Sequence, residues 1–457
     1  MNYEDFLVSK RLVVPAAGRD INRDLLHPAL FPFQRDLVHW SLRKGRAAIF
    51  ADCGMGKTIM QLEWARHAAG RTLILAPLAV AQQSVAEGRK WGYTVTYCRS
   101  GEDAPREGTV ITNYEMMSHF DPSRFEAVVL DESSILKSFE GKMRSALIER
   151  FQETPMRLCC TATPAPNDIS EIANHAEFLG HMTRAEMLAA FFVHDDAGWR
   201  LKGHARTAFY RWLASWGMSV RRPSDINEEY GDAGWNLPSL AIEPQFIEVE
   251  TPPSDRLFQV GLKGVTERAT VRRDTLRERV EAAAALIRTE SDVPWLAWVG
   301  LNEEGRLLQQ EIPTALLVEG SQSPDEKAQH MGDFSAGRAR ILITKPSVSG
   351  HGMNWQHCNR MVFVGLSDSY ESYYQCIRRC WRYGQKKPVV VHIVLSDRET
   401  DIYANVLSKE AEAKQMAEEL VKNVTSFSRD EMTNATARQD YAASQEMILP
   451  SWLEAGR

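Results

Sequence analysis

Short apolar runs alternate with longer amphipathic segments in the first part of the chain. Runs of four or five mostly apolar residues lie at 47–50, 72–76, 127–130 and 157–160, and helical spacing appears between them, for example at 58–69. Unbroken apolar runs of this length are typical of strands that are buried on both faces. The alternation predicts a parallel sheet with helices on both sides.

The same pattern returns in the second half of the chain, with apolar runs at 295–301, 314–320, 339–344, 360–366 and 389–395. The sequence therefore predicts an α/β protein with two lobes. The segment between them is rich in Trp, Phe and Arg and has mostly helical spacing. We predict an N-terminal lobe at 1–180, a helical insertion at 181–250, a C-terminal lobe at 251–405 and a helical tail at 406–457.

Composition narrows the class of protein. The 457 residues are 44% hydrophobic and 25% charged, which is ordinary for a folded globular chain. No apolar run approaches the ~20 residues of a membrane span, the acidic start is unlike a signal peptide, and the odd number of cysteines indicates reduced thiols. We therefore expect a cytoplasmic protein without a membrane partner. A net charge of −6 does not exclude nucleic acid, because a local groove can still bind phosphates.

A phosphate site is predicted at 49–60, IFADCGMGKTIM, where an apolar strand leads through a glycine turn into a helix. Gly54 and Gly56 allow the backbone to approach a phosphate closely, and the N–H groups of the loop and helix face the anion. Lys57 supplies a charge for the outer phosphates of ATP, and Thr58 supplies a hydroxyl for Mg²⁺. The alternative is a glycine-rich loop that arose by chance.

A second element of the same chemistry lies at 125–134, FEAVVLDESS. Its apolar run ends in Asp131 and Glu132, and ligands bind at the carboxyl ends of strands in open parallel sheets. Asp131 is placed to hold Mg²⁺, and Glu132 to position and deprotonate an attacking water. A strand that ends in Asp-Glu is a weak signal alone and a strong one beside a phosphate loop.

Three arginines crowd the segment QCIRRCWRYGQ at 375–385 without a neighbouring carboxylate. An inserted arginine stabilises the charge that spreads over a γ-phosphate during transfer. Arg379 and Arg382 fit this role if the second lobe closes on the first. The alternative is that the arginines, Arg378 included, pair with carboxylates elsewhere in the fold.

From about residue 28 to residue 402 the sequence resembles superfamily-two helicases, most closely the Swi/Snf-type ATPases, which are double-stranded DNA translocases with two RecA-like lobes. Besides the phosphate loop and the Asp-Glu pair, the resemblance rests on ordered segments. These are FPFQRDLVHW (31–40), APLAVAQQSVAEGRKW (76–91), VITNYEMM (110–117), CCTATPAPN (159–167), SVSGHGMNW (347–355) and QCIRRCWRYGQKKPVVVHIVL (375–395). The chain resembles the compact versions that phage and prophage genomes encode.

The resemblance implies roles for individual residues. In the nucleotide site Gln34 reads the adenine, and Met55 and Gly352 belong to the binding motifs. Gln375 stands with Arg379 and Arg382 in the Gln-Arg-Arg positions of the final motif. Contacts with the nucleic-acid backbone fall to Pro77, Thr112, Tyr114 and Asn354. Apart from the resemblance, Lys345 is a further candidate because it comes just after the apolar run at 339–344. Coupling between ATP and DNA falls to Thr161, Thr163 and Ser134.

One departure from the family affects that coupling. The usual Asp-Glu-Ala-His is Asp-Glu-Ser-Ser here, so Ser134 replaces a histidine and cannot carry charge. The arginines between 268 and 279 alternate with carboxylates and favour a solvated helix face. Basic residues at 200–211 form a second candidate surface for DNA.

Three functions remain open. The first is an ATP-dependent translocase on duplex DNA. The second is a strand-separating helicase on DNA or RNA. The third is an ATP-dependent clamp with little turnover that recruits a partner nuclease or replication protein.

Overall fold

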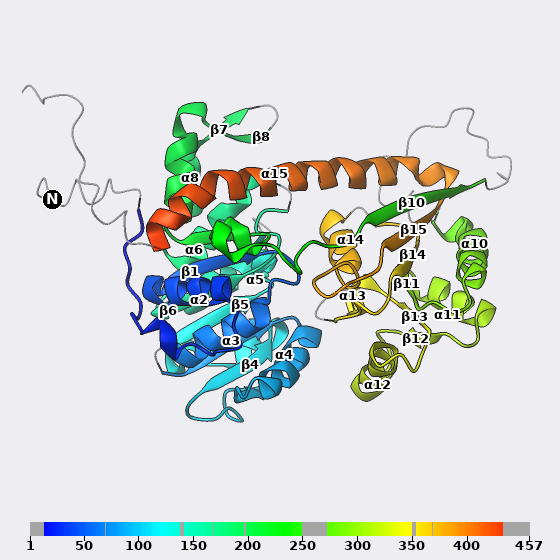
Figure 1. The fold of residues 1–457 in the computed structure, drawn as a ribbon, viewed down its shortest axis with the longest axis horizontal. Coiled ribbons are helices and arrows are strands. Elements are labelled where there is room, and N and C mark those ends of the chain that lie inside the picture. Colours follow the sequence, from blue (N-terminus) through cyan, green and yellow to red (C-terminus); the bar gives the residue numbers. More distant parts are fainter. Residues whose placement is uncertain are drawn as a thin grey trace, which may run out of the picture.

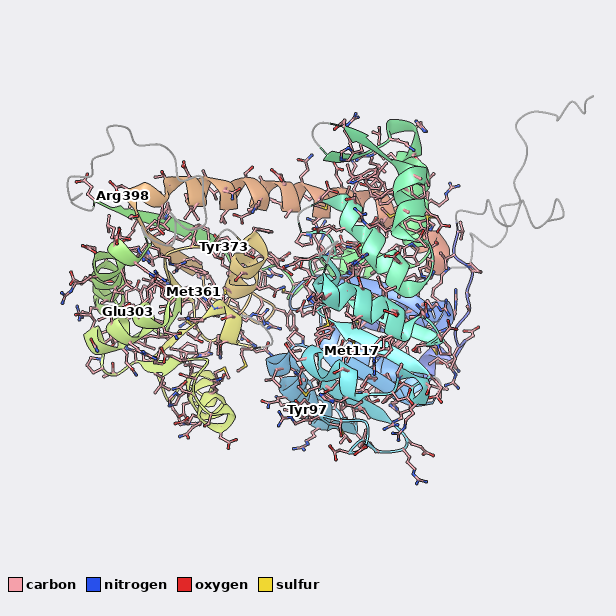
Figure 2. The ribbon with its side chains drawn as sticks, turned by 180° about the vertical axis from the view of Figure 1, so that it is seen from behind. Tyr97, Met117, Glu303, Met361, Tyr373 and Arg398 are labelled. Atoms are coloured by element: carbon pink, nitrogen blue, oxygen red, sulfur yellow. The ribbon has the colours of Figure 1, made fainter. Side chains whose placement is uncertain are left out.

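Two parallel sheets, each flanked by helices, lie side by side in the structure (Figure 1). Seen from behind, Met117 lies in one lobe and Met361 in the other (Figure 2), and both side chains are buried. The prediction of an α/β protein with two lobes is confirmed. The computed structural model describes residues 13–68, 70–137, 141–166, 168–195, 198–248, 272–349, 353–367 and 369–432.

Lobe one contains a seven-stranded sheet in the order β3-β4-β2-β5-β6-β1-β9, with every neighbouring pair parallel. The apolar runs that predicted strands form β1, β2, β5 and β6. The strands are β1 (Arg46–Ala51), β2 (Thr72–Ala76), β3 (Val95–Tyr97), β4 (Thr109–Asn113), β5 (Ala127–Asp131), β6 (Met156–Cys160) and β9 (Gly217–Val220). Helices of this lobe are α2 (Pro32–Lys44), α3 (Lys57–His67), α4 (Leu78–Lys90), α5 (Lys142–Phe151) and α6 (Ile172–Leu179).

The strand order decides where the chemistry gathers. Strands β1 and β5 both border β6, so their carboxyl ends lie at the same edge of the sheet. The phosphate loop leaves β1 at that edge, and Asp131 ends β5 there. The fold therefore brings the two predicted elements of the ATP site together, although about 75 residues of sequence separate them.

The segment between the lobes is divided differently from the predicted helical insertion. It begins with α7 (Arg184–Phe191), a β7 (Phe192–Asp195) and β8 (Gly198–Leu201) hairpin, and α8 (Arg206–Ala214). Strand β9 then pairs with β1 and completes the sheet of lobe one, whereas β10 (Leu240–Ile247) pairs with β15 in the sheet of lobe two. Both strands belong to lobe sheets because their backbone groups hydrogen-bond to a lobe strand.

Lobe two contains a six-stranded sheet in the order β10-β15-β14-β11-β13-β12. Its remaining strands are β11 (Trp295–Val299), β12 (Leu316–Val318), β13 (Ile341–Thr344), β14 (Arg360–Val364) and β15 (Val389–Ser396). Its helices are α10 (Leu276–Thr289), α11 (Asn302–Glu311), α12 (Pro324–Ser335), α13 (Pro346–Ser349) and α14 (Tyr370–Ile377).

A single long helix, α15 (Thr400–Met432), runs from lobe two back to lobe one (Figure 1). Its first turns place Ile402 and Val406 in the core of lobe two. Its later turns place Leu420 and Val424 in the core of lobe one, where it packs on α8. The tail predicted at 406–457 is therefore, as far as residue 432, an apolar tie between the lobes.

A buried ion-pair network lies at the start of α10. Arg279 is fully buried and its Nη1 lies 2.8 Å from Glu304 Oε1, while Arg272 Nε lies 3.0 Å from the same oxygen. Burial alone raises the pKa of Glu304, but the two guanidinium groups lower it below its usual value. The predicted solvated face is therefore wrong for Arg272 and Arg279, while Arg277 is exposed as expected.

Replacing Glu304 by Ala should destabilise the protein by ~3–5 kcal/mol, because the buried guanidinium of Arg279 and the half-buried one of Arg272 lose the carboxylate that they share. Chemical denaturation measures this loss. The matched control is Glu281→Ala, which removes the exposed partner of Arg277 on the same helix and should cost ~0.5 kcal/mol or less. Equal losses in the two variants would contradict a central role for the network.

Candidate active site between the lobes

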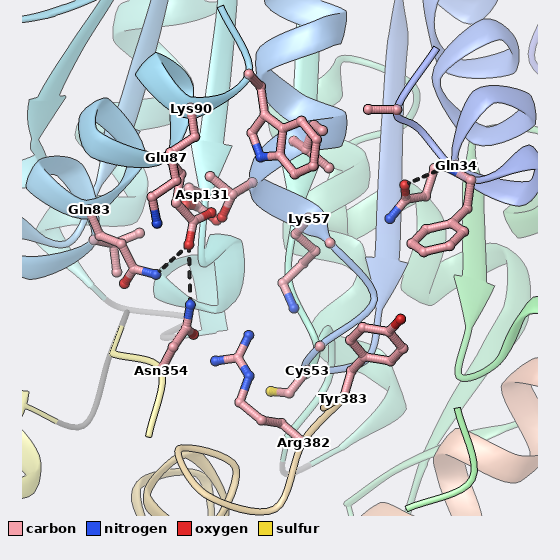
Figure 3. Close-up of a pocket in the computed structure, with 18 of the residues that line it drawn as sticks. Gln34, Cys53, Lys57, Gln83, Glu87, Lys90, Asp131, Asn354, Arg382 and Tyr383 are labelled. Carbon is pink, nitrogen blue, oxygen red and sulfur yellow. Dashed lines mark hydrogen bonds between the residues drawn. The ribbon is translucent and has the colours of Figure 1, made fainter. Parts of the chain in front are cut away.

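A cleft of about 360 Å³ opens between the lobes and is lined by both of them. Lobe one contributes Lys57 and Asp131, and lobe two contributes Asn354, Arg379 and Arg382. Figure 3 shows Lys57, Asp131 and Arg382 around the same space. The structure therefore brings most of the predicted nucleotide-site residues into one cavity.

The loop between β1 and α3 needs glycine at two positions. Gly54 and Gly56 have φ values of 90° and 82°, which L side chains rarely adopt. A Cβ at Gly56 would lie 2.3 Å from Gln34 Nε2, and a Cβ at Gly54 would lie 3.0 Å from the backbone nitrogen of Tyr383. The loop thus touches α2 on one side and lobe two on the other.

Lys57 begins α3, and its Nζ donates to the carbonyl of Ala51 at 2.9 Å. The ammonium group therefore lies along the loop, where the N-terminus of α3 also favours an anion. Thr58, the next residue of α3, also lines the cleft. A loop that presents an ammonium group and a helix N-terminus in this way suits a chain of phosphates.

Asp131 is 3% exposed at the end of β5. Gln61 Nε2 donates to its Oδ2 at 2.9 Å, and the backbone N–H of Glu132 donates to its Oδ1 at 3.0 Å. Burial and the neighbouring Glu132 raise the pKa of Asp131 to about 6. Because Thr58 and Asp131 both face the cleft, their hydroxyl and carboxylate oxygens form a donor set that Mg²⁺ prefers.

Gln34 lies at the other end of the cleft, next to an aromatic cluster. Its Oε1 accepts from the backbone N–H of Phe31 at 3.0 Å, and its Nε2 donates to the carbonyl of Met55 at 2.9 Å. One amide N–H and one lone pair of Gln34 remain for a ligand. Trp235 and Tyr383 pack together with ring centroids 4.3 Å apart and also line this end. Sequence analysis missed both rings, because neither belongs to a segment that the resemblance assigns to the base.

Gln375 orients Arg379 from within α14. Arg379 Nη2 donates to Gln375 Oε1 at 2.8 Å, and its Nε donates to the carbonyl of Gln375 at 2.9 Å. Arg382 has a weaker partner, the carbonyl of Met353 at 3.4 Å. Burial, together with the charge of Arg379, lowers the pKa of Arg382 to about 10. Two positive groups in one cleft favour an anion between the lobes.

Arg378 points to a different partner from its two neighbours. Its Nη2 lies 2.8 Å from Asp52 Oδ2 and donates to the carbonyl of Cys53 at 2.8 Å. The hydroxyl of Tyr374 donates to Asp52 Oδ1 at 2.6 Å. The alternative of an arginine paired with a carboxylate therefore holds for Arg378. Asp52 is the only acidic residue in the loop 51–58.

The residues expected to contact nucleic acid are divided between surface and interior. Pro77, Lys345 and Asn354 are half-buried, and Asn354 Nδ2 donates to Glu87 Oε1 across the lobes at 3.2 Å. Thr112 is fully buried, and Tyr114 is 3% exposed with its hydroxyl on the carbonyl of Asp131. Contrary to expectation, these last two side chains are not available to a polymer, because they pack inside lobe one.

Two of the three predicted coupling residues, Thr161 and Ser134, are buried in lobe one. Thr161 is buried, and its Oγ1 accepts from the backbone N–H of Thr163 at 3.1 Å. Ser134 is buried in the short 3-10 helix that follows Glu132. Gly352 lies outside the described residues.

Two arginines of the second candidate DNA surface are paired with carboxylates of the chain. Arg200 pairs with Asp195 at 2.9 Å, and Arg206 pairs with Glu419 of α15 at 2.9 Å. Lys202 donates to the carbonyl of Ala189 at 2.7 Å. Arg200 and Arg206 therefore offer less free charge to a phosphate backbone than their sequence suggests, whereas Lys202 keeps its charge because the carbonyl is neutral.

Replacing Arg378 by Gln should loosen the contact between the lobes, because the half-buried carboxylate of Asp52 loses its charged partner. Spin labels on Glu107→Cys and Glu303→Cys, one exposed site in each lobe, should show a broader distance distribution by pulsed electron resonance. Arg338→Gln, which removes an exposed pair with Asp333 in lobe two, is the control and should leave the distribution unchanged. An unchanged distribution in both variants would contradict the importance of the contact.

Comparison with known proteins identifies two parts of the chain. Residues 33–188 match the SNF2-related domain, and residues 290–384 match the helicase conserved C-terminal domain. Among the described residues, no helix is long and apolar enough to cross a bilayer.

Individual relatives are distant. Protein p41 of Acyrthosiphon pisum secondary endosymbiont phage 1 is 22% identical over 463 aligned positions, covering 85% of this chain and 97% of that protein. The ATP-dependent RNA helicase FAL1 of Kluyveromyces lactis is 28% identical over 110 residues, about a quarter of either chain. A solved structure of an S. cerevisiae Dbp5 variant, bound to RNA and ADP–beryllium fluoride, matches with a TM-score of 0.54 and 13% identity. It covers 86% of this chain and 93% of that one.

The two domain matches, in the order and at the positions of the two RecA-like lobes, agree with the motifs that the sequence carries. The chain contains an SNF2-related domain and a helicase conserved C-terminal domain, a combination consistent with the superfamily-two helicases of the Swi/Snf type, and it is an ATP-hydrolysing, helicase-like enzyme.

Proposed function

We propose that this protein is an ATP-driven motor that moves along duplex DNA, of the kind that phages supply inside a bacterial host cell. The proposal rests on one observation above all. A single cleft contains the phosphate loop and carboxylates of lobe one, and Arg379 and Arg382 of lobe two. Nucleotide bound there makes contact with both lobes, so its hydrolysis changes the forces between them.

ATP would bind with its phosphates along Gly54 to Thr58 and its base toward Gln34. The free N–H and lone pair of Gln34 match the acceptor and donor on one edge of adenine. Thr58 and Asp131 would hold Mg²⁺, which neutralises charge on the outer phosphates when it is bound. Lys57 turns from the carbonyl of Ala51 to these phosphates, because an anion attracts the ammonium group more strongly than a neutral oxygen does.

Glu132 is the proposed base for the attacking water. Its Oε2 is buried without a hydrogen-bond partner among the described residues. A carboxylate oxygen in that state is available to accept a proton from water. Arg382, with its weak contact to Met353, would shift to the γ-phosphate as charge develops there, while Gln375 keeps Arg379 oriented beside it.

Motion would come from changing contacts between the lobes around the polymer. Pro77 follows β2 in lobe one, and Lys345 follows β13 in lobe two, so each lobe offers a strand end to the phosphate backbone. Asn354 and Glu87 join the lobes at the cleft. If nucleotide draws the lobes together and hydrolysis releases them, each cycle moves one contact relative to the other along the strand.

A strand-separating RNA helicase is the second candidate. Two relatives favour it, since FAL1 is named an RNA helicase and the Dbp5 structure contains RNA. The match of 33–188 to the SNF2-related domain favours duplex DNA. Turnover measured without polymer and with single-stranded DNA, duplex DNA and RNA, each at several salt concentrations, separates these candidates. A clamp that recruits a partner nuclease or replication protein would show little turnover with any polymer.

Arg382→Ala should preserve ATP binding and reduce DNA-stimulated hydrolysis by about 10³-fold, because transition-state charge loses its partner from lobe two. Steady-state hydrolysis with and without duplex DNA measures the loss. Lys57→Ala should abolish hydrolysis with or without DNA, and Arg338→Ala, a surface arginine of the same lobe, should change nothing. Stimulation at the wild-type level in Arg382→Ala would contradict the proposed role.

Affinity for Mg²⁺–ADP should fall as the pH drops through 6, because Asp131 must lose its proton to bind the metal and its pKa is raised to about 6. A site with this pKa is about tenfold weaker at pH 5 than at pH 7. Titration with a fluorescent ADP, with Mg²⁺ and with EDTA, isolates the metal-dependent part. In Asp131→Asn that part should be small and independent of pH, and a pH-independent affinity in the wild type would contradict the assignment.

A further inference from the structure

The loop that carries Glu132 has a backbone conformation that side-chain-bearing residues avoid. Glu132 has a φ of 54°, and it is the only non-glycine residue with positive φ in the described part of the chain. Such a conformation persists only where surrounding contacts hold it. The direction of the Glu132 carboxylate therefore depends on its neighbours on both sides.

Buried hydrogen bonds hold the loop before and after Glu132. On the preceding side, the hydroxyl of Tyr114 donates to the carbonyl of Asp131 at 2.8 Å. On the following side, Ser133 Oγ lies 3.1 Å from Nε2 of His175 on α6. Ser133 and His175 are both fully buried. Because both side chains are shielded from solvent, that bond is strengthened and fixes the residue after Glu132.

His175 itself is held in place by its surroundings. Its ring packs edge-on against Phe50 of β1, with centroids 5.4 Å apart. The neighbouring Asn174 donates at 2.8 Å to the carbonyl of Leu136, which lies near the end of the 3-10 helix Ser133–Lys137. Burial lowers the pKa of His175 to about 4, so the imidazole is neutral at physiological pH. Helix α6 thus grips the loop at two points.

We propose that His175 is a positioning residue for the catalytic carboxylate of Glu132 and acts through Ser133. The inference rests on the proposed role of Glu132 as the base. The segment Asp-Glu-Ser-Ser contains no histidine of its own. Here α6 brings His175 to Ser133 of that segment. Loss of the bond lets Glu132 relax toward negative φ, which turns its carboxylate away from the attacking water.

The consequence is specific to the chemical step. Lys57, Thr58 and Gln34 do not contact Ser133 or His175 through any hydrogen bond in the described structure, so nucleotide affinity is independent of the pair. A misdirected Glu132 lowers kcat and leaves the KM for ATP nearly unchanged. A purely structural role for His175 would lower the folded fraction instead.

The test compares Ser133→Ala, His175→Leu and His175→Gln in the full-length chain. Ser133→Ala and His175→Leu should each lower kcat by about 10-fold or more, with the affinity for fluorescent ADP changed less than about twofold. Combined, they should be no slower than the slower single variant, because both remove the same bond. Gln places an amide nitrogen near the position of Nε2, so His175→Gln should recover most of the rate.

His181→Leu is the matched control. His181 is also a histidine whose pKa burial lowers, to about 3, and its Nε2 lies 3.0 Å from the carbonyl of Arg46, away from the Glu132 loop. It should lose stability like His175→Leu and keep its kcat.

Several results would overturn the inference. They are a kcat within twofold of wild type in Ser133→Ala, an equal loss of kcat in His181→Leu, or a rate in His175→Gln as low as in His175→Leu. If His175→Leu does not fold, Ser133→Ala decides alone, since it removes one hydroxyl. Normal turnover in Glu132→Gln would refute the proposed base itself, which is a separate outcome from any result with His175.

Discussion

The contact of Arg378 with Asp52 is the constraint on which the cleft depends. It joins the turn after α14 of lobe two to the phosphate loop of lobe one at 2.8 Å, and the same guanidinium donates to the carbonyl of Cys53. Burial alone lowers the pKa of Arg378, but the adjacent Asp52 raises it above the usual range. Removing one partner of such an ion pair is costly, so the pair holds the phosphate loop in a fixed position relative to lobe two.

This contact separates the tasks of three neighbouring arginines. Arg378 is occupied by Asp52, and Arg379 is held by Gln375, while Arg382 has only a distant carbonyl. The arginine with the weakest partner is the one best able to move to a phosphate. Arg382 is therefore the arginine of the three that can move within the cleft, because Arg378 and Arg379 are held by other side chains.

The long helix α15 sets a second limit on how the lobes move. Its two ends lie in the cores of different lobes, and Glu419 near its far end pairs with Arg206 of lobe one. A wide opening of the cleft requires those apolar residues to leave a core, which is unfavourable. We therefore expect any nucleotide-driven movement to be a small shift of the lobes around the contact between Arg378 and Asp52 of the phosphate loop. A small shift suits the role proposed for Glu132, because the backbone at Glu132 tolerates little change.

Local sequence determined strands β1, β2, β5, β6 and β11 to β15, the glycines of the phosphate loop and the carboxylates at the end of β5. It did so because burial on both faces, positive φ and strand ends leave marks within a few residues. The tertiary structure alone decided what each arginine meets, that His175 reaches Ser133, and that Tyr114 is buried rather than exposed. Arg378 and Arg379 are neighbours in the turn that follows α14, yet they reach different partners, Asp52 and Gln375. Asp52 lies more than 300 residues before Arg378, and only the folded chain brings such groups together.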